Sequence, residues 1–265
     1  MLIFFDIDGT LIGKDSGIIP ESARNAIQKA RAAGHICMIN TGRSRKLVGT
    51  DLTGQTEFDG LALGCGTMIV YRGEILLHKS FSGKEGRQII EGLRRNKIDA
   101  CLEGSEDNFC ERDDRIVTDV FRSFIHRFDH LCYRPVEEAV GHFDKLYAYA
   151  DRTEKMETFR EEFGELLDFV DRKEGYFEIM PKGYSKASAM EFMARRLSIP
   201  MSQVAAVGDS SNDLSMLKCA GISIAMGNAT EDVKETADFV STDVDHNGIR
   251  NALSWLEKTV SSGRI

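Results

Sequence analysis

The stretch FFDIDGTLIG, residues 4–13, decides the fold, because it places two aspartates directly behind an apolar run. Residues 2–5, LIFF, have the composition of a short buried strand that ends at Asp6. Asp8 follows two residues later, so an extended backbone turns both carboxylates to the same side. Two carboxylates this close repel each other unless a positive charge lies between them. The spacing therefore calls for a positively charged group at the end of the first strand.

Length and composition indicate a globular protein with room for more than one compact unit. The chain has 265 residues, more than the about 100–200 that are usual for one domain. Hydrophobic residues make up 42% and charged residues 29%, and the net charge of -8 argues against a nucleic-acid-binding surface. No apolar stretch approaches the about 18 residues of a membrane span, and the N-terminus lacks the pattern of a signal peptide. We expect a small-molecule partner, with neither nucleic acid nor membrane involved.

The cysteines show neither C-x-x-C pairs nor the dense spacing of a disulfide scaffold. We therefore predict reduced thiols in a cytoplasmic protein. The six residues are Cys37, Cys65, Cys101, Cys110, Cys132 and Cys219.

Alternating strand and helix patterns predict an α/β core with a mainly parallel sheet. The segment 20–34 opens with Pro20 and closes with Gly34, as helices do, and the runs MIVY and EILLH around Arg72-Gly73 suggest a hairpin. The other predicted core elements are strands at 35–40, 60–64, 204–208, 222–225 and 238–240, and helices at 185–197 and 211–220.

The rhythm changes between about residues 82 and 184, where the sequence reads as α+β. We predict a core in two segments, 1–81 and 185–265, with 82–184 inserted between them. Inside the insertion we expect helices at 83–96, 114–128 and 154–164, and strands near 99–111, 145–150 and 167–180.

The residues that follow the predicted core strands are acidic or hydroxylic. Asp6 and Asp8 follow the first strand, the triplet 41–43 follows the second, and GDSSND at 208–213 follows VAAV. Ligands of parallel sheets gather outside the carboxyl ends of the strands, so four carboxylates should converge on one crevice. Oxygen ligands without histidine or thiolate indicate a hard cation, most favourably Mg²⁺. With few protein ligands, Mg²⁺ keeps coordination positions for a substrate phosphate, which lets Asp6 approach phosphorus while Asp8 manages protons.

Together these motifs resemble the haloacid dehalogenase superfamily of phosphotransferases: DIDGT at 6–10, TGR at 41–43, a lysine before a helix, and GDSSND. More narrowly, MPKGYSKASAM at 180–190 and AMGNATEDVKETADFVSTDVDHNGI at 225–249 resemble the Cof-type, sugar-phosphatase-like branch with a C2B-type cap. The resemblance covers roughly 1–80 and 185–265. It implies a Rossmann-like three-layer core and an inserted α+β cap that recognises the leaving group.

The resemblance also implies a function and a role for each site residue. The function is Mg²⁺-dependent hydrolysis of a small phosphorylated metabolite, a sugar phosphate or a related compound. Asp6 would be the nucleophile that forms an aspartyl-phosphate, and Asp8 the general acid and base. The implied metal ligands are Asp6, Asp8 through its backbone carbonyl, and Asp209, with Asp213 supporting the metal shell; Thr41, Gly42, Arg43, Lys186 and Asn212 would contact the phosphate or substrate.

Simpler explanations exist for several of these residues. Asp8-Gly9 reads by itself as a turn, and Thr41 as the N-cap of the helix that follows it. Arg43 reads as a solvated helix residue and Lys186 as a solvated lysine at a helix start. Asp213 reads as an acid favoured by the helix dipole.

Two other functions are compatible with the motifs: a phosphomutase resembling phosphomannomutase, and a metabolite-binding regulator without catalysis. A nucleotide cofactor is not expected, because GCGTMI at 64–69 lacks the third glycine of a dinucleotide fingerprint. The same stretch departs from the Cof-type pattern, in which Asn-Gly usually stands at Cys65-Gly66.

Overall fold

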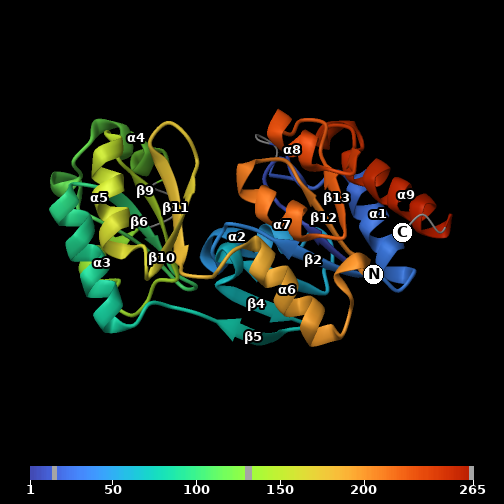
Figure 1. Ribbon diagram of the computed structural model, residues 1–265, viewed down its shortest axis with the longest axis horizontal. Coiled ribbons are helices and arrows are strands. Elements are labelled where there is room, and N and C mark those ends of the chain that lie inside the picture. The colour runs from blue at the N-terminus through green and yellow to red at the C-terminus, as the bar shows by residue number, and fades with distance from the viewer. Residues whose placement is uncertain (14–16, 129–132, 263–265) are drawn as a thin grey trace. The chain divides into compact units, whose positions relative to one another are not determined.

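The structure is a computed structural model that describes residues 1–13, 17–128 and 133–262 (Figure 1). The chain forms two compact units. The core unit comprises Met1–Gly42, Val48–Leu77 and Ser185–Ile265, and the inserted unit comprises Arg43–Leu47 and His78–Tyr184.

The core unit is built on an eight-stranded sheet in the order β14-β13-β12-β1-β2-β3-β4-β5. Neighbouring strands from β14 to β3 run parallel, and β4 runs antiparallel to β3. The predicted α/β class with a mainly parallel sheet is thus confirmed. The strands are β1 (Leu2–Phe5), β2 (Ile36–Asn40), β3 (Gly60–Leu63), β4 (Met68–Tyr71), β5 (Glu74–His78), β12 (Val204–Gly208), β13 (Ile222–Ala225) and β14 (Phe239–Val240).

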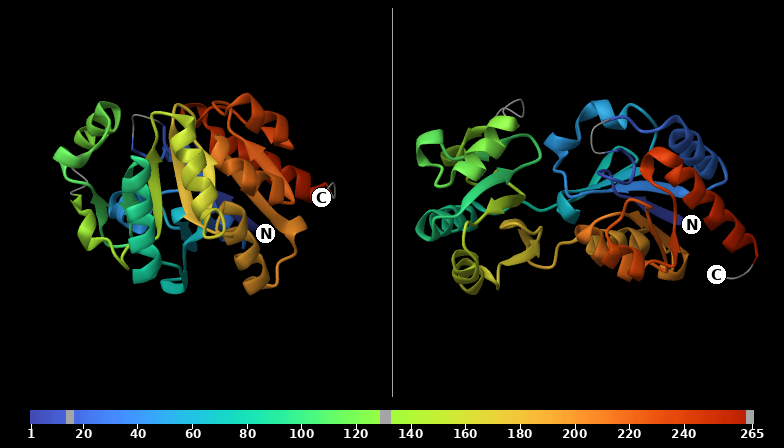
Figure 2. Two further views of the ribbon diagram at one scale, coloured as in Figure 1. Left: turned by 60° about the vertical axis from the view of Figure 1, so that its left-hand side comes forward. Right: turned by 90° about the horizontal axis from the view of Figure 1, so that it is seen from above.

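Successive side chains of a strand point to opposite faces of the sheet, so helices pack on both faces and the core unit has three layers. Ile3 and Phe5 of β1 pack with α1 (Glu21–Ala32), α2 (Arg45–Thr53) and α9 (Gly248–Ser261). Leu2 and Phe4 point the other way, toward α6 (Lys186–Leu197), α7 (Leu214–Cys219) and α8 (Glu231–Thr236). The right-hand view of Figure 2 shows the blue and red helices α1 and α9 on one side of this sheet and the orange helices on the other. A one-residue slip of β1 would exchange these faces, so packing fixes where β1 ends.

The predicted hairpin is present between β4 and β5, which are neighbours in the sheet. Arg72 and Gly73 join them with φ angles of 49° and 85°. Two consecutive positive φ angles are typical of the tight turn whose twist matches that of a β-ribbon.

The inserted unit contains a six-stranded sheet in the order β10-β11-β9-β6-β7-β8. Its pairings are antiparallel except for β7 with β8. Helices α3 and α5 pack on one face, against Ala100 and Leu102, while α4 packs on the other, against Cys101. The elements are α3 (Gly83–Asn96), β6 (Asp99–Glu103), β7 (Asn108–Cys110), α4 (Asp119–Arg127), β8 (Arg134–Pro135), β9 (Lys145–Tyr149), α5 (Thr153–Phe163), β10 (Leu167–Asp171) and β11 (Tyr176–Pro181).

One predicted helix begins later than expected. The helix expected from residue 114 begins at Asp119 instead, because a carboxylate far away in sequence holds the preceding backbone extended. Asp99 accepts hydrogen bonds from the backbone N–H groups of Val117 and Thr118, at 2.8 and 2.9 Å. Thr118 then caps the helix by accepting from the N–H of Phe121. The sequence analysis also did not predict α8, α9 and β8.

Two further expectations concern thiols and membranes. Burial raises the pKa of Cys37 and of Cys110 to about 12, which keeps both as neutral thiols. Cys132, one of the predicted reduced cysteines, lies outside the described residues. None of the helices that the structure describes has the length and apolar character needed to cross a bilayer.

Candidate active site

Asp6 follows β1 directly and begins a tight loop. The carbonyl of Ile7 accepts hydrogen bonds from the N–H groups of Leu11 and Ile12, at 2.9 and 3.0 Å. The side chains of these three residues are buried in the core layer that α1 and α9 cover. The apolar positions of the motif therefore anchor the loop, and its polar positions remain at the end of the sheet.

Gly9 lets this loop lie against the loop that follows β12. It has a φ of 82°, and a Cβ at this position would lie 2.2 Å from Oδ2 of Asp209. Only glycine combines this backbone conformation with the available space. The glycine of DIDGT thus brings the two acidic loops together.

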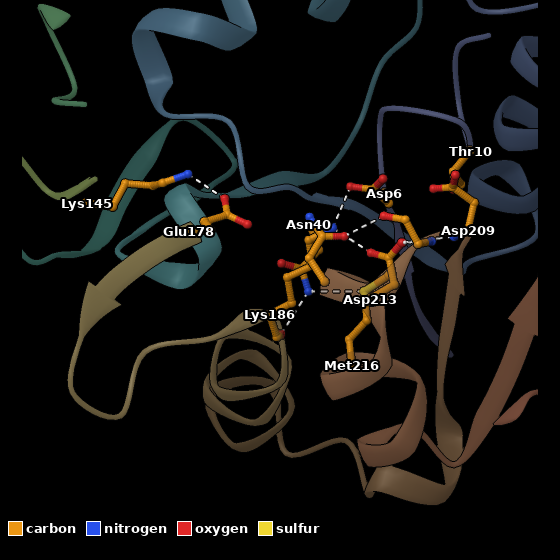
Figure 3. A network of polar contacts seen from close by, with 11 residues as sticks. Asp6, Thr10, Asn40, Lys145, Glu178, Lys186, Asp209, Asp213 and Met216 are labelled. Carbon is orange, nitrogen blue, oxygen red and sulfur yellow. Dashed lines mark hydrogen bonds and ion pairs between the residues drawn. The ribbon is translucent and has the colours of Figure 1, made fainter. Parts of the chain in front are cut away.

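Lys186 joins two of the aspartates. It is the first residue of α6, which Ser185 caps by accepting a hydrogen bond from the N–H of Ser188. Its Nζ lies 2.6 Å from Oδ1 of Asp6 and 2.5 Å from Oδ1 of Asp213, and its side chain is fully buried. Figure 3 shows the ammonium group reaching toward both carboxylates.

Asp213 also organises the backbone of the acidic loop. Its Oδ2 accepts hydrogen bonds from the N–H groups of Asp209 and Ser210, at 2.9 and 3.0 Å. Since Oδ1 already bonds Lys186, both oxygens of Asp213 have protein partners. This carboxylate therefore holds in place the residues around it.

The carboxylates gather closely enough to share a metal ion. One oxygen from each of Asp6, Asp209 and Asp213 lies within 4.8 Å of the other two. With Lys186 as the counter-charge, this buried group would carry a net charge of -2 if all three carboxyl groups were ionised. Burial, with the Asp213 carboxylate adding to it and Lys186 opposing both, raises the pKa of Asp6 to about 8 from an ordinary 3.8.

Lys186 itself stays charged. Burial alone lowers its pKa, but the Asp213 and Asp6 carboxylates outweigh burial, so the pKa lies above its ordinary value. One ammonium group nevertheless cannot balance three carboxylates, and a divalent cation would cancel the remaining charge. Carboxylate oxygens are hard donors that suit Mg²⁺.

The remaining predicted residues lie in different environments. Asp8 is exposed, and its carboxylate is not part of the group of three. Thr41 is buried after β2, where its N–H donates to the carbonyl of Ala62 at 2.9 Å. Since α2 begins at Arg45, with Ser44 before it, the alternative explanation of Thr41 as the helix N-cap is wrong. Arg43 groups with the inserted unit.

Asn212 and Gly42 complete the predicted set. Asn212 is half-buried on the acidic loop, and its Oδ1 accepts from Oγ of Ser210 at 2.9 Å. Gly42 is also half-buried and follows Thr41 directly.

The motifs and their geometry agree with a comparison with known proteins. The sequence pattern of haloacid dehalogenase-like hydrolases matches residues 3–253. The chain belongs to this family. The predicted resemblance to the haloacid dehalogenase superfamily and the prediction of a hydrolytic enzyme are therefore confirmed.

Individual relatives extend over nearly the whole chain. YkrA of Bacillus subtilis (strain 168) is 30% identical over 273 residues, covering 96% of this chain and 97% of YkrA. The 5-amino-6-(5-phospho-D-ribitylamino)uracil phosphatase YwtE of the same organism is 29% identical, covering 93% of this chain and 94% of YwtE. Among solved structures, the phosphatase BT1666 from Bacteroides thetaiotaomicron has a TM-score of 0.84 at 27% identity, covering 96% of this chain and 93% of that one.

Asn40 is a site residue that the sequence analysis missed. It ends β2, is fully buried, and its Nδ2 donates to the backbone carbonyl of Lys186 at 2.9 Å (Figure 3). This bond fixes the first residue of α6, from which the ammonium group extends. The sequence did contain a signal for Asn40, because it is a polar residue at the end of the apolar run ICMIN.

Cys65 keeps a backbone conformation that suits the asparagine usual in the Cof-type pattern. Its φ and ψ are 54° and 39°, in the left-handed region, where asparagine is enriched. Its N–H donates to the carbonyl of Thr41 at 3.0 Å. Cysteine at this position therefore changes the side chain beside Thr41 while retaining the turn.

The inserted unit has a buried polar group of its own. Nζ of Lys145 lies 2.5 Å from Oε1 of Glu178 and 3.4 Å from Oε2 of Glu103. Asn108, opposite Glu103 in the sheet, is fully buried, and its side-chain amide has no hydrogen-bond partner among the described residues. Buried polar groups are costly unless they are satisfied, so this group is a candidate for binding a polar ligand.

Proposed function

We propose that this hydrolase is a Mg²⁺-dependent phosphomonoesterase that acts on a small phosphorylated metabolite through an aspartyl-phosphate on Asp6. The observation that carries the proposal is the buried Asp6 carboxyl group, whose Oδ1 lies 2.6 Å from Nζ of Lys186 and which shares a group of three acidic side chains with oxygens within 4.8 Å of one another. A buried carboxylate beside a cation is suited to attack an anionic phosphoryl group, whose charge would otherwise repel it.

The residues present fit a magnesium ion. Asp6 and Asp209 offer carboxylate oxygens, and the backbone carbonyl of Asp8 would be a further oxygen ligand. Asp213 would support them, because its oxygens already hold Lys186 and the N–H groups of Asp209 and Ser210. When bound, Mg²⁺ supplies positive charge that offsets the carboxylates and the substrate phosphate.

Asp6 and Asp8 have different roles in the two chemical steps, phosphoryl transfer to Asp6 and hydrolysis of the aspartyl-phosphate. An oxygen of Asp6 bonds to phosphorus as the ester P–O bond breaks, and the Asp8 carboxyl gives its proton to the departing oxygen. Asp8 then takes a proton from water as that water attacks phosphorus and breaks its bond to Asp6. The first step leaves Asp8 deprotonated, so it can act as the base in the second step, which returns its proton.

Other residues would bind the phosphate and the leaving group. Thr41, Gly42, Lys186 and Asn212 would contact the transferring phosphoryl group, with Arg43 as a further cation. The inserted unit would act as a cap that selects the leaving group and excludes water.

A relative suggests which substrates to test first. YwtE is named for a substrate that carries a phosphorylated ribityl chain. We therefore propose phosphorylated polyols and sugars as the first members of a substrate panel, ranked by kcat/KM.

Hydrolysis of p-nitrophenyl phosphate with and without metal tests the proposal. Chelation should abolish turnover and added Mg²⁺ should restore it. Mass spectrometry of the quenched enzyme should find phosphate on Asp6 and none in Asp6→Asn. Full activity in excess chelator, or phosphate on another residue, would contradict the proposal.

A further inference from the structure

Asn228 connects three loops at the end of the core sheet. It lies between β13 and α8, and the flanking Met226 and Ala229 are buried, which anchors the loop. Its side chain is exposed, yet both ends of the amide bond to protein. Nδ2 donates to the carbonyl of Gly9 at 2.7 Å, and Oδ1 accepts from the N–H of Val244 at 3.0 Å.

The partners fix which way the amide points. A backbone carbonyl only accepts and a backbone N–H only donates, so nitrogen must face Gly9 and oxygen must face Val244. An exposed asparagine would otherwise exchange its hydrogen bonds with water. Here it acts as a brace between two backbones.

The brace holds Gly9, the glycine of the loop that begins at Asp6. Gly9 adopts a φ of 82°, and its N–H donates to the carbonyl of Ile12 at 2.9 Å. Asn228 holds the other end of the same residue through its carbonyl. With both ends held, the two peptides that flank Gly9 cannot rotate freely, although glycine would allow it.

The loop of Asn228 also reaches the second acidic loop. The N–H of Thr230 donates to the carbonyl of Asp209 at 3.0 Å. Residues 228–230 therefore hold the backbones of both loops that carry the proposed chemistry.

We propose that Asn228 is a positioning residue that fixes the Gly9–Thr10 peptide and, through it, the Asp8 carboxyl for proton transfer. The inference rests on the proposed function of Asp8. In the step concerned, an Asp6 oxygen bonds to phosphorus, the ester P–O bond breaks, and the Asp8 proton passes to the departing alkoxide oxygen. An alkoxide needs that proton, whereas p-nitrophenolate leaves without it.

Kinetics of the first turnover test the positioning. In Asn228→Ala, phosphoryl transfer from glucose 6-phosphate should slow by about tenfold or more, with KM within about twofold of wild type. Transfer from p-nitrophenyl phosphate should slow by less than about threefold. Asn228→Asp keeps the shape and the acceptor for Val244 but loses the donor for Gly9, so it should behave like the alanine variant. Asn251→Ala is the matched control, since it removes an amide that donates to Oγ1 of Thr242 at 2.9 Å.

Hydrogen exchange gives a readout that does not depend on activity. In Asn228→Ala the backbone amides of residues 7–12 should exchange faster than in wild type, and they should not change in Asn251→Ala. Unchanged exchange in this segment overturns the inference, whatever the activity. Equal slowing with both esters also overturns it, as does an Asn228→Asp variant that behaves like wild type. A wild-type enzyme that fails to hydrolyse either ester contradicts the proposed function instead, and exchange still decides whether Asn228 holds the loop.

Discussion

Replacing Lys186 by methionine removes the ammonium group that pairs with Asp6 and Asp213. Methionine keeps a long apolar chain, so the buried stem of the lysine is largely replaced. The three carboxyl groups remain, and the net charge of the fully ionised group changes from -2 to -3. We expect a large loss of stability in the Mg²⁺-free protein.

The size of the loss follows from two contacts. Lys186 makes charge-assisted hydrogen bonds of 2.6 and 2.5 Å to two buried carboxylates. At about 1.5–3 kcal/mol each, these give about 3–6 kcal/mol. Removing one partner from a buried ion pair typically costs about 3–5 kcal/mol, which agrees. We therefore expect the free energy of unfolding to fall by about 3–5 kcal/mol.

The loss should depend on pH and on metal. Lys186 lowers the pKa of Asp6, so without it the folded-state pKa of Asp6 lies even further above the ordinary value. Below about pH 8 both folded proteins keep Asp6 protonated and lose stability in parallel as pH rises. Above about pH 8 only the variant continues to lose stability, so the loss should be larger at about pH 9 than at about pH 7. Added Mg²⁺ should stabilise the variant more than wild type, because its cluster carries one more negative charge.

Urea unfolding with and without Mg²⁺ measures these effects. Lys29→Met is the matched control, because Lys29 pairs with Glu257 at 2.9 Å but is exposed, and exposed pairs contribute little. The control should unfold close to wild type. A Lys186→Met loss of less than about 1 kcal/mol, or one equal to that of the control, would refute the argument that the buried pair holds the cluster together.

Three further predictions concern the acidic loops. With p-nitrophenyl phosphate, Asp8→Ala should accumulate phosphoenzyme in a burst because water is no longer activated, whereas Asp6→Asn should form none. Rapid-quench mass spectrometry measures the phosphoenzyme, and wild-type turnover by Asp8→Ala would contradict the separate roles of Asp6 and Asp8. Gly9→Ala should abolish Mg²⁺ binding in calorimetry, because its Cβ would lie 2.2 Å from Oδ2 of Asp209. The control Gly34→Ala also places a side chain at a positive φ, 88°, but its Cβ would have no atom within 4 Å. This control should bind Mg²⁺ like wild type, with a backbone strain of about 1–2 kcal/mol. In the Mg²⁺-free wild type, the urea midpoint should fall between pH 5 and pH 8, because the pKa of Asp6 is about 8 in the folded protein against an ordinary 3.8; an identical slope in Asp6→Asn would be inconsistent with that origin.

The sequence determined the elements whose causes are local. The helix predicted at 83–96 coincides with α3, and the strands predicted at 204–208 and 222–225 coincide with β12 and β13. Capping residues, glycines and apolar runs lie within a few positions of these boundaries, so the local sequence is enough to predict where the elements begin and end. The prediction that a helix begins at residue 114 was wrong because the cause is not local: Asp99, on strand β6, holds the segment before α4 extended.

The sequence also brought the acidic residues to one place. Asp6 and Asp209 each follow an apolar strand, and the carboxyl ends of parallel strands meet at one edge of the sheet. The structure has β1 and β12 as parallel neighbours, so this inference needed only strand order and direction.

Only the tertiary structure decided how these groups are held. The pairing of Lys186 with Asp6 and Asp213, and the use of both Asp213 oxygens, depend on how α6 and the loop after β12 pack against β1. Asn40 and Asn228 bond to backbone groups that lie 146 and 219 residues away in the chain. Periodicity describes which face a residue lies on, but a hydrogen bond needs two atoms about 3 Å apart, and strand register and helix packing set that distance.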